Sequence, residues 1–288
     1  ERPKNNFQLL IIFHMKEQLN SLRVLLTNDD GISASGLVLL EELLVPLVNE
    51  LWVVAPQTDQ SGASHSLTLR QPLRVREMGS KRFSVSGTPA DCVLLAVNQI
   101  MKDCKPDLVI SGINRGKNVG EDVNYSGTIA AAKEASAFGI PAIALSQVID
   151  PVDYFSENKE VDLIYSASKT HCVDLIHDLL TISWPANAVM SINFPLVGDG
   201  VVKGVAVTHG NWRKRGDKII TNQDGRGQPY FWIGPREEID KNMGGSDLEA
   251  LESSVISVTP LSLEVVEQDV LQNLQESLNT KKTRLRWS

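Results

Sequence analysis

The sequence has 288 residues, of which 42% are hydrophobic and 22% charged, and this suits one large α/β domain or one domain with an appended lobe. Its formal net charge of −7 argues against a general nucleic-acid binder, because such proteins carry basic surfaces. The cysteines Cys92, Cys104 and Cys172 are too few and too widely spaced for a zinc centre or a disulfide framework, so we expect a reducing, cytoplasmic compartment.

The first 20 residues differ from the rest of the chain, and we expect a leader or an extraneous segment there. The apolar run 7–13 is too short to span a membrane, and no small-residue cleavage site follows it. Met15 is a candidate for the natural start. Since no other stretch is long and apolar enough to cross a bilayer, the sequence predicts no membrane partner.

The stretch 24–32 predicts a buried strand that runs into two adjacent carboxylates. Residues 24–26 are apolar, as in a central strand of a parallel sheet, and Asp29, Asp30 and Gly31 follow. Neighbouring like charges retain a proton unless a cation compensates them, and a hard divalent cation with oxygen ligands does so. The plain alternative is a solvated Asp-Asp-Gly turn.

A helix and a second, parallel strand are expected next. Ser35 is a good N-cap for a helix over residues 36–48, although Pro46 weakens its last turn, and residues 51–55 form the strand. The connections are short, so the crossover should be right-handed.

Polar residues follow this second strand, and the carboxyl ends of adjacent parallel strands share one crevice. We therefore expect the Ser61 hydroxyl to lie beside Asp29 and Asp30. His65 is a candidate proton donor to a leaving group in the same crevice. The alternative for His65 is a surface histidine that takes no part in chemistry.

The middle of the chain continues the α/β pattern. Residues 67–77 and 81–85 predict a hairpin, and Thr88 predicts the N-cap of a helix over residues 89–100. Residues 106–112 are typical of another buried strand.

The exit of that strand, residues 111–120, contains three glycines, two asparagines and two cations. Asn114 offers a neutral amide oxygen to a cation, whereas Asn118, Arg115 and Lys117 can donate hydrogen bonds to an anion. Glycine-rich loops bind phosphates because bare backbone N–H groups can approach them.

This loop ends at Ser126, Gly127 and Thr128, which open an alanine-rich helix over residues 129–138. Free N–H groups, two hydroxyls and the positive end of the helix dipole together predict an anion site. The alternative is an ordinary capped helix. Residues 140–145 then predict a further buried strand.

Three strand exits thus supply two carboxylates, a serine and an asparagine beside a phosphate-binding loop. All the candidate metal ligands are oxygens, which favours Mg²⁺, Mn²⁺ or Ca²⁺ over a thiolate-bound metal. Such a site suits metal-assisted hydrolysis of a phosphomonoester.

Several motifs of the chain resemble the survival protein E (SurE) family of 5′-nucleotidases. These motifs occur in the family's order at residues 25–32, 53–56, 60–66, 86–92, 111–116, 125–128 and 257–261. The resemblance implies a Rossmann-like core with a smaller oligomerisation lobe, and a divalent-metal-dependent phosphatase acting on nucleoside 5′-monophosphates. Matched position by position, Asp29, Asp30, Ser61 and Asn114 correspond to the metal ligands, with the two aspartates as catalytic residues. Asn118, Ser126, Gly127 and Thr128 correspond to the phosphate contacts.

The C-terminal third predicts less chemistry. Residues 161–180 have helical periodicity, 201–208 form a strand, and 218–222 with 230–233 form a hairpin whose Phe231-Trp232 pair suggests contact with another subunit. In the resembled family such elements exchange between subunits, so we expect a homodimer or a homotetramer. The alternative is a hairpin that packs on its own domain.

These segments divide the chain into four parts. We place a leader at residues 1–20, the catalytic core at 21–200, a β-rich oligomerisation lobe at 201–265, and a C-terminal helix with a basic tail at 266–288.

Rival classes fit the strand exits less well. A receiver-type signalling domain needs a phospho-acceptor aspartate at a middle strand exit, where this chain has Ser111 and Asn114. A haloacid-dehalogenase-type phosphatase needs Asp-x-Asp, whereas here the carboxylates are adjacent. A non-catalytic metal- or nucleotide-binding protein on the same fold remains the alternative, because fold alone does not prove activity.

Overall fold

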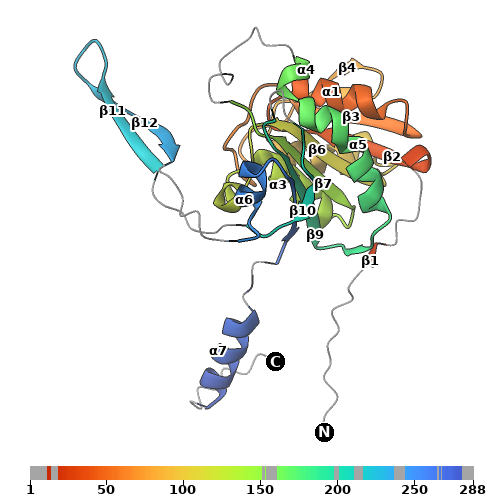
Figure 1. Ribbon diagram of the computed structural model, residues 1–288. Helices are drawn as coiled ribbons and strands as arrows, with labels where there is room; N and C mark the ends of the chain where they lie inside the picture. Colours follow the sequence, from red (N-terminus) through yellow and green to blue (C-terminus); the bar gives the residue numbers. More distant parts are fainter. Residues whose placement is uncertain are drawn as a thin grey trace.

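A nine-stranded sheet forms the centre of the described part of the chain, with helices on both faces (Figure 1). The computed structural model describes residues 12–13, 19–150, 153, 161–197, 201–210, 217–236, 244–264, 266 and 268–280. The strands of the main sheet are, in spatial order, β10 (Val205–Val207), β13 (Ile256–Ser262), β9 (Ala188–Phe194), β7 (Ala142–Gln147), β6 (Leu108–Arg115), β2 (Arg23–Thr27), β3 (Glu50–Pro56), β5 (Arg82–Val85) and β4 (Val75–Gly79).

The middle of this sheet is parallel. Strands β5, β3, β2, β6, β7 and β9 pair parallel to their neighbours. β4 and β13 pair antiparallel at the two sides, and β10 pairs parallel with β13. The predicted Rossmann-like, mostly parallel α/β sheet is therefore confirmed.

Alternate residues of β2 enter different cores, which explains its continuous apolar sequence. Val24 and Leu26 pack with α1 (Ser35–Leu44) and α5 (Ser166–Leu180) on one face. Leu25 packs with α2 (Pro89–Leu95) and α3 (Gly127–Ala137) on the other face. The smaller helical elements are η1 (Leu19–Ser21), η2 (Ala96–Ile100), η3 (Gly120–Asn124), α4 (Val161–Ile164) and α6 (Asp247–Glu252).

The chain changes its direction of winding at β2. It runs from β2 to β3 and β5 on one side, and then crosses to β6, β7 and β9 on the other. The carboxyl ends of β2 and β6 form the topological switch point, which is where ligands bind in open α/β sheets.

Helix α1 lies very close to β6 near this point. A Cβ built on Gly36 would lie 2.0 Å from the carbonyl oxygen of Ile113 and 3.0 Å from the Tyr165 hydroxyl. Glycine at this position therefore lets the start of α1 touch the strand that carries Asn114.

Several boundaries differ from those that the sequence predicts. Helix α1 ends at Leu44 and not at residue 48, because Pro46 cannot continue the helix without a clash with an earlier carbonyl. β4 begins only at Val75, and Pro72, which lacks the N–H that a ladder needs, lies in the part that is not strand. The expected helix over 161–180 is divided into α4 and α5 at Tyr165.

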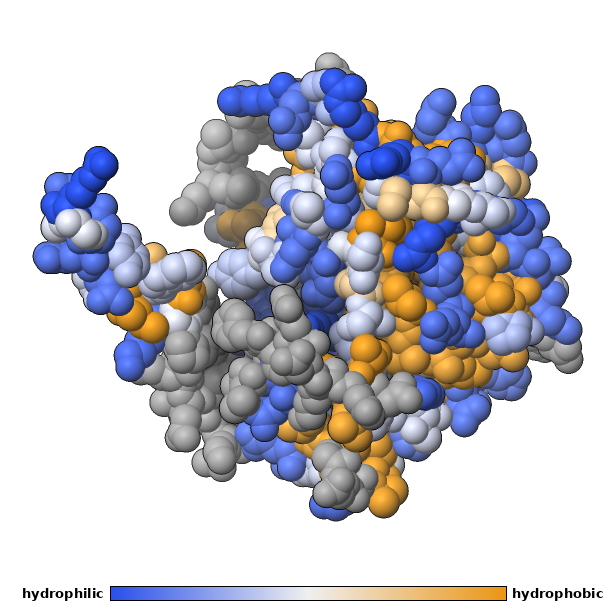
Figure 2. Space-filling model, turned by 90° about the horizontal axis from the view of Figure 1, so that it is seen from above, coloured by the Kyte–Doolittle hydropathy of each residue, from blue (hydrophilic) through white to orange (hydrophobic). Residues whose placement is uncertain are grey.

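The predicted hairpin is present and stands apart from the main sheet. It consists of β11 (Asp217–Gln223) and β12 (Pro229–Arg236), which pair antiparallel (Figure 1). Seen from above, it carries hydrophobic residues away from the body of the protein (Figure 2). The side chains of Phe231 and Trp232 are each 64% exposed, so the hairpin leaves apolar surface without cover in the described chain.

The ends of the chain show two further arrangements. In the expected leader, β1 (Ile12–Phe13) pairs antiparallel with β8 (Trp184–Pro185). β10 and β13, which lie within the residues expected to form a separate lobe, extend the main sheet. Helix α7 (Gln268–Thr280) follows, and the predicted basic tail from residue 281 lies outside the described residues.

The cysteines have no disulfide partner. Cys92 and Cys172 are buried, and burial raises the pKa of the Cys172 thiol to about 12, so this thiol stays protonated and unreactive. Within the described segments, no helix combines the length and the apolar character needed to cross a membrane.

Candidate active site

The acidic pair lies on a turn that its neighbours hold in place. The Asn28 side chain donates to the carbonyl oxygen of Gly31 at 2.9 Å and accepts from the Gly31 N–H at 3.2 Å. Gly31 has φ of 102°, which favours glycine. The Gln60 N–H donates to the Asp29 carbonyl oxygen at 2.8 Å, so the loop after β3 is joined to the turn after β2.

Asp29 is only 4% exposed and is held by the start of α3. Its carboxylate accepts hydrogen bonds from the Thr128 hydroxyl and from the Thr128 backbone N–H. Gly127 also lies close, since a Cβ built there would be 2.7 Å from the Cβ of Asp29. Burial raises the pKa of Asp29, while the bonds from Thr128 lower it.

Asp30 is half-buried and faces the exit of β6. Its carboxylate accepts a hydrogen bond from the Arg115 backbone N–H at 3.1 Å. Burial, followed by repulsion from Asp29, raises the pKa of Asp30 from 3.8 to about 7. Two adjacent carboxyl groups that resist ionisation together are what a bound cation would stabilise in the charged form.

This burial predicts a pH-dependent cost to folding when no cation is bound. The folded-state pKa lies above the unfolded value, so stability is full below pH 3.8 and is lost as the pH rises toward 7. The loss is at most about 4 kcal/mol, since one pKa unit corresponds to about 1.4 kcal/mol. We expect the melting temperature of Asp30→Asn in EDTA to exceed that of the wild type increasingly between pH 4 and pH 7.5. An exposed control, Asp103→Asn, should follow the wild type, and a constant difference for Asp30→Asn would contradict the assignment.

The side chains of Ser61 and Asn114 each donate one hydrogen bond within the protein, and each keeps an oxygen that can accept a bond or bind a cation. The Ser61 hydroxyl donates to Asp59 at 2.6 Å, and its lone pairs remain. The Asn114 amide nitrogen donates to the carbonyl oxygen of Gly116 at 2.8 Å, which leaves the amide oxygen as the free acceptor. Both lie in segments bonded to the acidic turn, through Gln60 and Arg115.

The donor set is chemically consistent with a hard cation. It comprises two carboxylates, one hydroxyl and one amide oxygen, the ligand types that Mg²⁺, Mn²⁺ and Ca²⁺ accept. The described residues contain no group of three or more His, Cys, Asp and Glu side chains that could hold a metal. That part of the chain therefore holds no zinc-type cluster, whereas the predicted set of two carboxylates, a serine and an asparagine has the chemistry of a hard-cation site.

The start of α3 is buried and tightly bonded. The Ser126 hydroxyl accepts the Ile129 N–H at 3.1 Å and thereby caps the helix. Thr128 is fully buried and bonded to Asp29. Two of the predicted phosphate contacts, Gly127 and Thr128, thus lie beside Asp29, and the hydroxyls of Ser126 and Thr128 have protein partners.

Asn118 lies in the loop after β6, where its contacts are mainly structural. Its side-chain nitrogen donates to the Ser146 hydroxyl at 2.9 Å, and its backbone exchanges hydrogen bonds of 2.8 and 3.1 Å with the Asn193 side chain. The Gly120 N–H donates to Asp247 at 2.7 Å. The sequence did not predict a role at the site for Ser146, Asn193 or Asp247, although polar residues at the ends of two apolar strands were the available signal.

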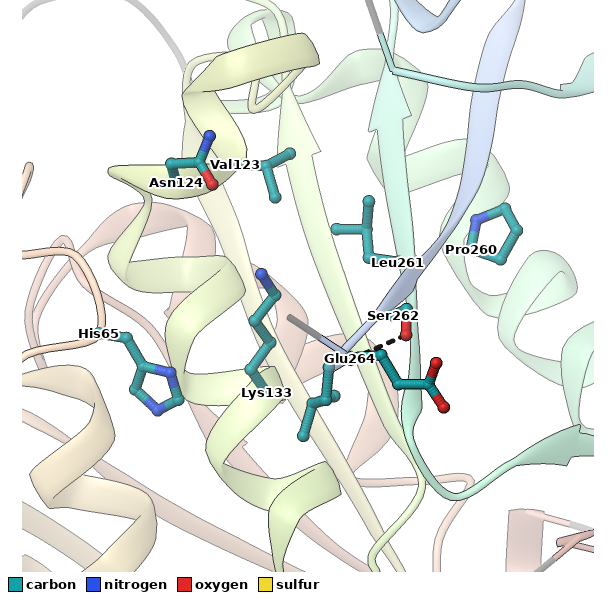
Figure 3. A pocket seen from close by; sticks show the side chains of 9 residues that line it. His65, Val123, Asn124, Lys133, Pro260, Leu261, Ser262 and Glu264 are labelled. Atoms are coloured by element: carbon teal, nitrogen blue, oxygen red, sulfur yellow. Dashed lines mark hydrogen bonds between the residues drawn. The ribbon is translucent and has the colours of Figure 1, made fainter. Parts of the chain in front are cut away.

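His65 lies against α3, beside Glu134. Its ring is 2.8 Å from the Glu134 carboxylate. It lines a cavity of about 470 Å³ with Asn124, Lys133 and residues of β13 (Figure 3). The contacts described for the ring do not include Asp29 or Asp30.

Comparisons with known proteins place the chain among the relatives of one family. The family model of survival protein SurE matches residues 24–217. A relative from Paramagnetospirillum magneticum named 5′-nucleotidase SurE is 46% identical over 259 residues, which cover 89% of this chain and 95% of the relative. A second, from Parvibaculum lavamentivorans and with the same name, is 43% identical over 268 residues, covering 92% and 94%. The crystal structure of the SurE protein from Aquifex aeolicus is 35% identical, with a TM-score of 0.74 over 89% of this chain and 99% of that chain.

Proposed function

The chain belongs to the survival protein SurE family, and we propose that it hydrolyses nucleoside 5′-monophosphates to nucleoside and phosphate with one divalent cation, Mg²⁺ or Mn²⁺. The observation that carries this proposal is the pair of adjacent, largely buried carboxylates at the switch point, in contact with the start of α3. Such a pair is costly without a cation, and the helix start favours an anion.

We assign the metal site to Asp29, Asp30, Ser61 and Asn114. A divalent cation held there would polarise a phosphoryl oxygen and make hydroxide available from bound water at neutral pH. The protein's contribution is to fix the ligands, through Thr128 for Asp29 and through the Arg115 N–H for Asp30.

We assign the phosphate to the start of α3 and to the loop that precedes it. The positive end of the helix dipole at Ser126, Gly127 and Thr128 favours the charge on the equatorial oxygens. Asn118 positions the loop through its bonds to Ser146 and Asn193. We expect its side-chain nitrogen to donate to phosphate only if it gives up the hydrogen bond to Ser146.

The role of His65 can be decided by mutation. A general acid contributes roughly 10²- to 10⁴-fold to a rate, whereas an exposed ion pair contributes little. Because the His65 ring is bonded to Glu134, we expect kcat of His65→Gln for nucleoside monophosphates to fall by less than about tenfold. A loss of more than a hundredfold would instead support proton donation by His65.

The exposed hairpin supports assembly. We propose that β11 and β12 contact a second copy in a homodimer or a homotetramer, since Phe231, Trp232 and Ile233 are between 64% and 79% exposed.

The unpaired cysteines support a reducing, cytoplasmic compartment.

Phosphate release from a panel of nucleoside 5′-monophosphates, with and without Mg²⁺ or Mn²⁺, tests the proposed activity. Release that requires the cation supports it. Nucleotide binding without release under either metal would favour the alternative, a non-catalytic binding protein on the same fold.

A further inference from the structure

A second cavity opens beside the acidic turn, and we call it the glutamine cavity. It has a volume of about 330 Å³ and is lined by Gln57, Gln60 and Gln71 and also by Ser86 and Thr88. The glutamines come from the loops that follow β3 and precede β4, and the hydroxyl residues follow β5.

The cavity adjoins the acidic turn directly. Gln60, in its wall, donates its N–H to the Asp29 carbonyl oxygen at 2.8 Å. Thr58, also in the wall, lies 3.2 Å from the position of a Cβ built on Gly31. Adjacent strands are about 4.8 Å apart, so the ends of β3 and β5 place the cavity about 5 to 10 Å to the side of the carboxylates. A group attached to a phosphate at the acidic pair by a sugar would reach it.

The lining is polar but uncharged. None of the side chains that line the cavity carries a charge. Within the described chain, Gln57 and Gln71 make no side-chain hydrogen bond, so each amide keeps two donors and an acceptor for a ligand. Glutamine amides pair with the donor and acceptor edges of nucleobases, adenine above all.

The cavity beside His65 differs from the glutamine cavity in its charge. The cavity beside His65 is lined by Lys133 and Glu264 as well, so both signs of charge are present there (Figure 3). An uncharged base fits the glutamine cavity better, and a second anion fits it poorly.

The rim of the glutamine cavity is held in place by its own hydrogen bonds. The Thr88 hydroxyl donates to the Ser66 carbonyl oxygen at 2.7 Å, and the Ser86 hydroxyl accepts the Arg74 N–H at 2.9 Å. The Thr68 N–H donates to Asp91 at 3.1 Å. These bonds leave the wall formed before a ligand arrives, which reduces the ordering cost of binding.

We infer, on the basis of the proposed function, that the glutamine cavity holds the base of the nucleoside 5′-monophosphate whose phosphate lies at the acidic pair. Gln57 and Gln71 are then the residues that make affinity depend on the base. The sugar spans the rim at Gln60 and Thr58.

Binding affinity with and without a base tests this assignment. Calorimetric titrations with Ca²⁺ bound in place of Mg²⁺ or Mn²⁺, under conditions in which no phosphate is released, compare adenosine 5′-monophosphate with ribose 5-phosphate for the wild type and for the double variant Gln57→Ala, Gln71→Ala. We expect the wild type to bind the nucleotide about tenfold more tightly, because each lost hydrogen bond costs a measurable factor in affinity. In the double variant the preference should fall to about threefold or less. Gln99→Ala, which changes an exposed glutamine outside the cavity, should keep the wild-type ratio.

Equal affinities of the wild type for the two ligands, or a preference that the double variant retains, would overturn the assignment. The activity is read separately, from phosphate release with metal present. Base-dependent binding without any release would support the cavity as the base site and overturn the proposed hydrolysis instead.

Discussion

Asp30→Asn is expected to lower metal-dependent phosphate release from nucleoside 5′-monophosphates by roughly a thousandfold, because Lewis-acid activation by a cation is worth several kcal/mol. The substitution removes one negative charge and one anionic oxygen ligand from the proposed cation site. The amide oxygen of the new asparagine can still accept the hydrogen bond from the Arg115 backbone N–H. The measurement is kcat/KM with Mg²⁺ or Mn²⁺ for both proteins.

The folded state should survive this substitution. Burial and repulsion from Asp29 raise the pKa of Asp30 to about 7, so the charged carboxylate destabilises the metal-free protein. A neutral asparagine removes this electrostatic cost. Activity is thus expected to fall while thermal stability in EDTA rises, and this opposite pair of changes separates loss of chemistry from loss of fold. Near-normal turnover of the variant would show that the metal site is assigned wrongly. The exposed control Asp103→Asn should retain both properties of the wild type.

Gly36→Ala is expected to lower the free energy of unfolding by about 3 kcal/mol, since overpacking of a tight contact typically costs 1 to 3 kcal/mol or more. The new Cβ would lie 2.0 Å from the carbonyl oxygen of Ile113, a backbone atom that cannot turn aside. Helix propensity alone predicts that Gly36→Ala raises the free energy of unfolding, because alanine is favoured over glycine in a helix by up to about 1 kcal/mol. Denaturant unfolding of both proteins measures the effect.

A matched control is available in Gly79→Ala, where a Cβ would meet nothing within 4 Å. Its unfolding midpoint should stay close to that of the wild type. If Gly36→Ala were neutral or stabilising, the close contact between α1 and β6 would not exist in solution. Activity should fall in Gly36→Ala as well, because the displaced residue Ile113 precedes Asn114.

Local signals in the sequence were sufficient for the centre of the fold. The apolar residues of β2 and the short connections predicted the parallel core, Thr88 predicted the start of α2, and the structure confirms both. The antiparallel pairing of β13 with β9 was not predicted, because it depends on residues far apart in the chain. The part of residues 67–77 before Val75 was wrongly expected to be strand, since its hydrophobic pattern outweighed Pro72 in the prediction.

The candidate site shows the same division. Asp29, Asp30 and Thr128 were identified from local patterns, and the structure brings them together. The bonds of Asn118 to Ser146 and Asn193 could not be predicted, because they require the side-by-side arrangement of β6, β7 and β9. The roles assigned to Ser61, Asn114 and the helix start in binding metal and phosphate stay predictions.

The two hydrogen bonds from Thr128 to Asp29 join the first turn of α3 to the acidic turn as a single mechanical unit. A cation that draws Asp29 toward itself therefore also moves the helix start, so the affinities for cation and for phosphate are thermodynamically coupled. Such coupling is reciprocal: whatever factor the cation adds to phosphate affinity, phosphate adds to cation affinity. Inorganic phosphate, the product of the proposed hydrolysis, should consequently retain the proposed cation on the protein after each turnover, and its accumulation should slow turnover most when free cation is abundant.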